Sequence, residues 1–319
     1  MSGGDEVMEP ANRTRHRMTS VGEFLIIYGG FDELSSIVFR ELWSFSTASG
    51  IWKQYQPPNE TENGFFSSTI CAEGNIVYIF GGSYESFGHE LRNSLISFDI
   101  SDATWKTLSP HSDEHYPNAP PPMIESCIFY HAKSLYILGG LHSKNYVDSM
   151  FKFCLKTSTW SLVEQNGQKP LINFRISGTV FNNKFYTFCF SLIARPGRYK
   201  TIYIFNLSTN TWTSRETSPN TQLYPDDRTR ESYAFSSKFI YISGGEFCGG
   251  YLSDIWRIDL ETLEWFQLAE TFNTGVYLHC TSIVSESNLY RFGGVRHGSN
   301  SLNKFERIRV WPPQNVSSL

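Results

Sequence analysis

Two arginines have the side chain and the spacing needed to bind an anion. Arg175 and Arg228 each stand where a predicted strand begins. They precede the Gly-Gly position of their own sequence repeats, which are described below, by 14 and 16 residues. Two guanidinium groups that converge on one point would hold a carboxylate through bidentate, charge-assisted hydrogen bonds. The alternative is that each arginine pairs with an acidic neighbour. Beside Arg228 these neighbours are Asp226, Asp227 and Glu231. The residues alone leave both interpretations open.

Further candidate binding residues lie beside the Gly-Gly pairs or at the start of predicted first strands. They are polar or aromatic residues that either follow a Gly-Gly pair or precede a predicted first strand, and Arg15, His16 and Arg17 stand at such a position too. Residues on these connections more often face solvent or hold a loop than bind a ligand, but binding residues also concentrate there. The predicted peptide-binding site consists of Arg175, Arg228, Arg230, Tyr84, His142, Tyr277, His279 and Arg296.

Searches for catalytic motifs find almost nothing. The chain has no G-x-S-x-G, H-E-x-x-H, Walker or dinucleotide-binding pattern, and its eight histidines lack metal-ligand spacing. The repeated Gly-Gly pairs open no predicted helix, so they do not resemble a phosphate cradle. We therefore predict no cofactor, no metal site and no enzymatic activity.

Composition limits the class of protein. The formal net charge of −4 gives no reason to expect nucleic acid or an anionic membrane as a partner. No run of 18 apolar residues is present, and the N-terminus lacks the basic and apolar regions of a secretion signal. The six cysteines are scattered singly, as in a reduced protein. We expect an intracellular protein of the cytoplasm or the nucleus, or of both.

The elements that must position these residues form a repeat. Gly-Gly pairs end apolar runs five times, and a tryptophan follows four of the pairs after 21 to 24 residues. A sixth copy lacks the glycines, because Cys189 and Phe190 replace them before Trp212. Successive copies are 49 to 58 residues apart, which is the length of a kelch-type blade. The repeat residues are Gly29, Gly30, Gly81, Gly82, Gly139, Gly140, Gly244, Gly245, Gly293, Gly294, Trp52, Trp105, Trp160, Trp212 and Trp265.

Each repeat predicts a four-stranded sheet. Alternating apolar residues mark the strands, and the sheets would bury their faces by stacking around a ring. The fold class predicted is all-β, a six-bladed kelch β-propeller whose last blade is incomplete. The predicted blades are 13–57, 64–108, 123–163, 171–214, 226–268 and 274–312, with a flexible arm at 1–12 and a short tail at 313–319.

These residues resemble the kelch family over about 13–312, and three segments resemble one branch of it more closely. They are Val38–Trp43 with Ala48–Trp52, Leu252–Trp265, and Val276–Cys280. The resemblance implies a substrate receptor of cullin-2 ubiquitin ligases that captures protein C-termini ending in glycine. Such receptors bind elongin B/C through a helical segment after the last blade. Gln314–Leu319 is too short and polar for that segment, so we expect it to be absent and peptide capture to be retained.

Three functions follow as hypotheses. The first is a non-enzymatic module that binds a peptide or a C-terminal tail and acts as a ubiquitin-ligase substrate receptor. The alternative is a kelch scaffold or signalling protein that binds a folded partner through its loops and recruits no ligase. A propeller enzyme with a copper site is the third, and it has the least support from the residues.

Overall fold

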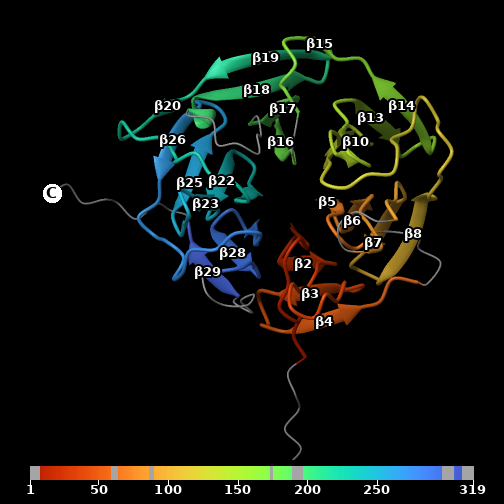
Figure 1. The fold of residues 1–319 in the computed structure, drawn as a ribbon, viewed down its shortest axis with the longest axis horizontal. Helices are drawn as coiled ribbons and strands as arrows, with labels where there is room; N and C mark the ends of the chain where they lie inside the picture. The colour runs from red at the N-terminus through yellow and green to blue at the C-terminus, as the bar shows by residue number, and fades with distance from the viewer. Residues whose placement is uncertain are drawn as a thin grey trace, which may run out of the picture.

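The computed structural model describes residues 8–58, 64–85, 90–172, 175–188, 197–296 and 305–310. Within them, six antiparallel sheets are arranged around a central axis, which makes the molecule a six-bladed β-propeller (Figure 1). The one helical element in the described part is a turn of 3-10 helix, η2 (Arg198–Lys200). No described helix is both long and apolar enough to cross a membrane.

The blades follow one another in chain order. Blade 1 contains β1 (Arg17–Val21), β2 (Phe24–Tyr28), β3 (Leu42–Ser46) and β4 (Trp52–Tyr55). Blade 2 contains β5 (Thr69–Glu73), β6 (Ile76–Phe80), β7 (Leu95–Asp99) and β8 (Thr104–Ser109). Blade 3 contains β9 (Cys127–His131), β10 (Ser134–Leu138), β13 (Met150–Cys154) and β14 (Thr159–Val163).

The second half of the ring repeats this order. Blade 4 contains β16 (Gly178–Phe181), β17 (Lys184–Thr187), β18 (Thr201–Asn206) and β19 (Thr211–Glu216). Blade 5 contains β21 (Ser232–Phe235), β22 (Phe239–Ser243), β25 (Ile255–Asp259) and β26 (Glu264–Gln267). Blade 6 has three described strands, β27 (Cys280–Val284), β28 (Asn288–Phe292) and β29 (Glu306–Arg309). The expected tail at 313–319 lies outside the described residues.

Short strands extend this plan. The connections after blades 3 and 4 add β15 (Asn166–Gly167) and β20 (Ser218–Pro219), which pair in parallel with β19 and β26 of the next blade. Two small hairpins follow Gly-Gly pairs. They are β11 (Leu141–His142) with β12 (Asn145–Tyr146), and β23 (Glu246–Phe247) with β24 (Gly250–Tyr251).

The core lies between neighbouring blades, because a single sheet cannot bury both of its faces alone. The repeat tryptophans pack on the third strand of their own blade, as in Phe98–Trp105, whose ring centroids are 4.6 Å apart. They also contact the preceding blade: Trp265 lies 5.3 Å from Phe188. Each tryptophan therefore joins a hairpin to the seam beside it.

The glycine pairs bring each blade close to the next. Gly29 and Gly30 have φ values of 61° and 109°, which side chains disfavour. A Cβ atom on Gly29 would lie 2.1 Å from the carbonyl oxygen of Phe65 in blade 2. The amide of Gly30 donates to that oxygen at 3.0 Å. Only a residue without a side chain permits this approach, which accounts for the repeated Gly-Gly.

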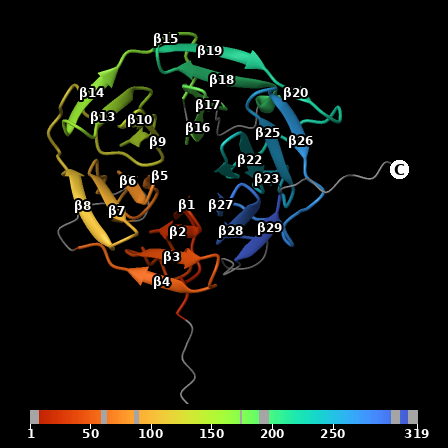
Figure 2. The same cartoon turned by 180° about the vertical axis from the view of Figure 1, so that it is seen from behind.

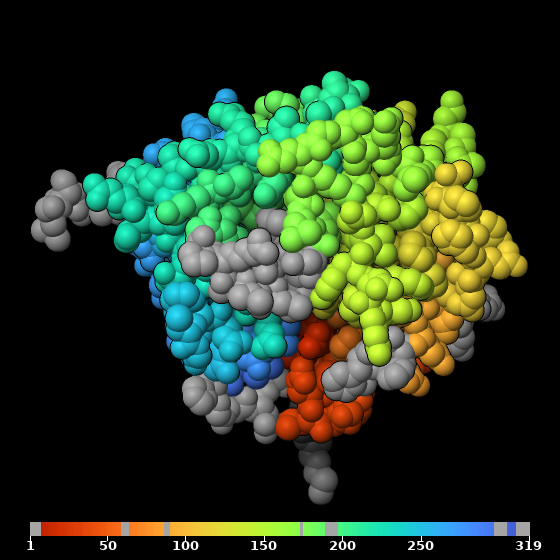
Figure 3. Space-filling view, turned by 45° about the horizontal axis from the view of Figure 1, so that its top comes forward, coloured from red at the N-terminus to blue at the C-terminus, as the bar shows by residue number. Residues whose placement is uncertain are grey.

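Blade 6 closes the ring against blade 1 by packing. In Figure 3 the blue last blade lies beside the red first blade. Met18, Leu25 and Trp43 of blade 1 share a buried cluster with Tyr290 and Phe292 of blade 6. Within the described residues, no fourth strand pairs with β29.

Candidate functional site

The inner strands of all six blades surround the axis of the ring (Figure 2), and the cavities along this axis form a central channel. A cavity of about 80 Å³ lies at its Gly-Gly end, lined by first-strand residues of every blade. A wider cavity of about 320 Å³ continues from it and shares Ile70, Ile128 and Tyr233 as lining. The two cavities therefore lie next to one another in the channel.

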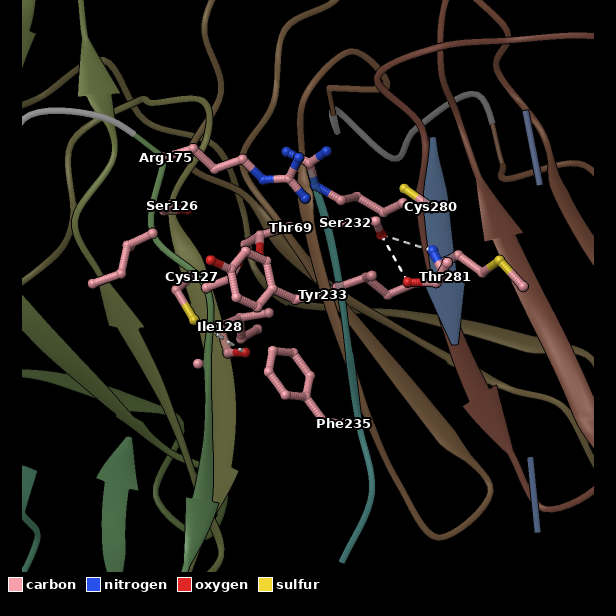
Figure 4. Close-up of a pocket in the computed structure, with 16 residues that line it drawn as sticks. Thr69, Ser126, Cys127, Ile128, Arg175, Ser232, Tyr233, Phe235, Cys280 and Thr281 are labelled. Carbon is pink, nitrogen blue, oxygen red and sulfur yellow. Dashed lines mark hydrogen bonds between the residues drawn. The ribbon is translucent and has the colours of Figure 1, made fainter. Parts of the chain in front are cut away.

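Arg17 and Arg175 both line the smaller cavity. Figure 4 shows Arg175 reaching across the cavity, with Tyr233 and Phe235 farther along it. Arg17 is 7% exposed, and burial followed by repulsion from Arg175 lowers its pKa to about 9. Arg17 therefore remains positively charged at neutral pH.

Neither of these arginines has a described carboxylate partner within 4.0 Å. Arg17 donates to the carbonyl oxygen of His16 at 3.2 Å. Glu125, the acid whose charge acts on Arg17, pairs with Arg15 at 3.8 Å. Two neighbouring positive charges without a counter-ion in a cavity make a site that favours an anion.

A hydroxyl group completes the donors beside the arginines. The backbone amide and the hydroxyl of Thr281 both donate to Ser232 Oγ, at 2.8 and 2.9 Å (Figure 4). Because Ser232 Oγ accepts these two bonds, its own proton remains available to a ligand oxygen. The site can therefore bind an anionic oxygen through two guanidiniums and one hydroxyl.

Arg228 does not belong to this site, so the expectation that it converges with Arg175 is wrong. It is 1% exposed, and it donates to both carboxylate oxygens of Asp254, at 2.6 and 2.8 Å. It also donates to the carbonyl oxygen of Gly244 at 3.2 Å. Its charge is neutralised inside the seam between blades.

The same arrangement occurs in blade 1, which shows that it is structural. Arg13 donates to Glu41 at 2.7 Å and to the carbonyl oxygen of Gly29 at 3.0 Å. Trp43 and Trp256 donate to Glu41 and Asp254, respectively. The sequence signal for this role is an acid two residues before the tryptophan of the third strand.

Comparison with known proteins supports the architecture. The sequence model of the KLHDC2/KLHL20/DRC7 Kelch-repeats domain matches residues 5–119 and 67–294. The chain belongs to the kelch-repeat family. It is 24% identical over 316 residues to Kelch domain-containing protein 10 of Rattus norvegicus, covering 95% of this chain and 76% of the relative. It is 25% identical to Kelch domain-containing protein 1 of Mus musculus, covering 89% and 76%. The kelch resemblance is confirmed, and kelch propellers of this kind are protein-interaction modules.

His279, a predicted peptide-binding residue, does not line either of the two channel cavities of this kelch propeller. It is 1% exposed, and its Nε2 lies 3.1 Å from Ser243 Oγ. Burial, followed by the charges of Arg291 and Arg175, holds its pKa well below 6.5. His16 is fully buried in blade 1, where burial and then Arg13, Arg17, His279 and Arg175 lower its pKa in the same way.

Acid should therefore destabilise the kelch propeller. Both histidines are neutral when folded, whereas the unfolded chain binds their protons below pH 6.5, so the free energy of unfolding falls as the pH drops below 6.5. Each contributes up to about 1.4 kcal/mol per pH unit. Urea unfolding between pH 7.5 and 5.5 measures this slope. It should shrink in the His16→Asn and His279→Asn variants and stay unchanged in the exposed-site control His115→Gln. An unaltered slope in the double variant would contradict the assignment.

The remaining candidates lie on the Gly-Gly face outside the channel cavities. Tyr84 is flanked by Arg40 and Arg92, and His142 Nδ1 lies 2.6 Å from the carbonyl oxygen of Pro122. Arg230 pairs with Glu246 at 2.9 Å and lies 5.4 Å from the ring centroid of Tyr277. Arg296 is exposed on blade 6.

The structure thus brings Arg175, but none of the other seven predicted residues, to the two described channel cavities. Arg17 and Ser232 are the additional members. A signal for them exists in the sequence: Thr69, Ser126, Ser177, Ser232 and Thr281 are small hydroxyl residues near the start of successive first strands. Among the described residues, no three His, Cys, Asp or Glu side chains form a group that could hold a metal ion.

Proposed function

We propose that this kelch propeller is a non-enzymatic recognition module that captures the C-terminal tail of a partner protein. The observation that supports this proposal is the pair Arg17 and Arg175, which line the same cavity without a described carboxylate partner. A terminal carboxylate supplies the missing charge and two acceptor oxygens. Ser232 adds a third donor to the same group.

The terminal residue of the tail is glycine in this proposal. The cavity around the two arginines is small, about 80 Å³, and Ile70, Ile128 and Tyr233 form part of its wall. A side chain on the last residue would compete with these walls for space, whereas glycine has none. The size of the cavity supports this preference, which also agrees with the branch of the kelch family that the sequence resembles.

Peptide binding tests the carboxylate clamp. Fluorescence polarisation with a library of glycine-ended peptides, each paired with its C-terminal amide, should show at least tenfold weaker binding of the amides. A charge-assisted hydrogen bond contributes about 1.5–3 kcal/mol, and a tenfold change corresponds to about 1.4 kcal/mol. Arg17→Gln and Arg175→Gln should remove this discrimination, while Arg230→Gln should keep it. Equal affinity for acids and amides would overturn the proposal.

We further propose that the captured proteins are substrates of a cullin-2 ubiquitin ligase, which would place the protein in the cytoplasm or the nucleus. This proposal rests on the resemblance of three segments to receptors of that kind, namely Val38–Trp43 with Ala48–Trp52, Leu252–Trp265, and Val276–Cys280. Affinity purification from cells should then recover elongin B/C and cullin-2 together with the propeller. Recovery of substrates without these subunits would leave tail capture intact and remove the ligase role.

A scaffold that binds a folded partner is the second candidate. Leu34 and Ile37 favour it, because these large apolar residues are 62% and 53% exposed on one connection of blade 1. A scaffold would lose its partner in a Leu34→Ser/Ile37→Ser variant and keep it in Arg17→Gln. A tail receptor would show the opposite pattern in the same pull-down.

A further inference from the structure

We propose, on the basis of the proposed tail capture, that the captured tails carry acidic residues shortly before their C-terminal glycine. These residues would lie on a surface that we call the arginine arc, formed by Arg15, Arg40 and Arg92 on blades 1 and 2. The arc is on the Gly-Gly face, the face on which the arginine-lined cavity opens.

Aromatic rings hold each guanidinium of the arc. Arg15 lies 5.3 Å from the ring centroid of Phe66. Arg40 and Arg92 both lie against Tyr84, at 5.0 and 4.7 Å from its centroid. A guanidinium stacked on a ring keeps its in-plane N–H donors free for a carboxylate. The three positive groups are thus oriented before any ligand arrives.

The three arginines of the arc are less neutralised by nearby carboxylates than Arg13, Arg228 and Arg230. Arg40 is exposed and forms no ion pair among the described residues. Arg15 has only a 3.8 Å contact with Glu125, and Arg92 has a 3.3 Å contact with Glu90, whose side chain is 57% exposed. Arg13, Arg228 and Arg230, by contrast, hold carboxylates at 2.6 to 2.9 Å.

The arc is continuous with the channel. Arg15 is two residues before Arg17, and its charge contributes to the lowered pKa of Arg17. The carbonyl oxygen of Arg15 accepts a hydrogen bond from Ser67 of blade 2, at the start of the neighbouring first strand. A tail anchored by its carboxylate in the channel can therefore leave across blades 1 and 2. An extended chain advances about 3.3 Å per residue, so a few upstream residues reach the arc.

The ligand class that fits the arc is an acidic peptide segment. Carboxylates of Asp and Glu match the planar donor edge of arginine. The chain as a whole carries a net charge of −4, which disfavours extended polyanions such as nucleic acid. The arc is a local basic surface suited to a short acidic stretch beside an anchored terminus.

Peptides of one length, all ending in glycine, test the arc. One series places Asp-Glu pairs two to eight residues before the terminus, and the matched series places Asn-Gln there. The acidic series should bind about three- to tenfold more tightly at low salt, since exposed ion pairs each contribute little, and the advantage should shrink at 0.5 M NaCl. Arg40→Gln/Arg92→Gln should remove the advantage. The control Arg230→Gln/Arg296→Gln, on blades 5 and 6, should preserve it.

The outcomes separate the two proposals. If amidation abolishes binding but Asp-Glu and Asn-Gln peptides bind equally, the arginine arc is refuted and tail capture stands. If acidic peptides bind equally as acids and amides, tail capture fails and the arc acts alone. An acidic advantage that survives the Arg40→Gln/Arg92→Gln change, in a variant with an unchanged melting temperature, also overturns the assignment to this surface.

Discussion

Replacing Asp254 with alanine should lower the free energy of unfolding by about 3–5 kcal/mol. The change leaves Arg228, which is 1% exposed, as an uncompensated buried charge, and that is the large cost of breaking a buried ion pair. It also removes the acceptor of Trp256 Nε1. Chemical denaturation of the purified protein measures the loss.

A matched control lies in the same blade. Glu246→Ala breaks the ion pair with Arg230, whose side chain is 47% exposed, and should cost no more than about 1 kcal/mol. The double replacement Arg228→Met/Asp254→Leu should recover most of the stability, because it removes both charges together. Similar losses in Asp254→Ala and Glu246→Ala would contradict a structural role for the Arg228–Asp254 pair.

Trp265→Ala should cost about 3–5 kcal/mol, the range typical of deleting a large buried aromatic residue. Trp265 is 0% exposed and packs against Phe188 and Tyr199 of the preceding blade. Its indole N–H donates to the carbonyl oxygen of Tyr199 at 3.0 Å. The variant therefore opens a cavity and removes one of the two hydrogen bonds to the Tyr199 carbonyl oxygen, the other coming from Thr217 Oγ1 at 2.6 Å. Thermal and urea unfolding measure the loss.

Trp105→Ala provides the comparison, because Trp105 occupies the same repeat position but is only partly buried. Its replacement should cost clearly less than that of Trp265. Equal costs would mean that the tryptophan stabilises its own hairpin alone and that its contact with the preceding blade contributes little.

The fold was accessible from the sequence because the repeat fixes packing at many positions at once. Gly29 and Gly30 require positive φ and a nearby carbonyl, and Trp265 requires a seam to fill. The glycine pair recurs in five of the six copies, and so does the tryptophan. Blade number and strand order follow from spacing alone.

The site was only partly accessible, because spacing from the glycines does not determine where a long side chain points. Arg17 and Ser232 share one strand position, since each pairs with the residue immediately before a Gly-Gly pair. Arg228 stands four residues earlier, at the position of Arg13, and that position faces the seam. The position of Arg17 can be told from that of Arg228 only when the pairing register of the first strand and the location of Asp254 are known.

The seam between the last and first blades makes the same bond as the seams after blades 1 and 5. Gly294 donates to the carbonyl oxygen of Arg13 at 3.2 Å, as Gly30 does to Phe65 and Gly245 to Val276. The same hydrogen bond therefore joins blades that are consecutive in the chain and also joins blade 6 to blade 1, which are far apart in the chain. A circularly permuted chain that begins at a different blade would therefore preserve each of these hydrogen bonds.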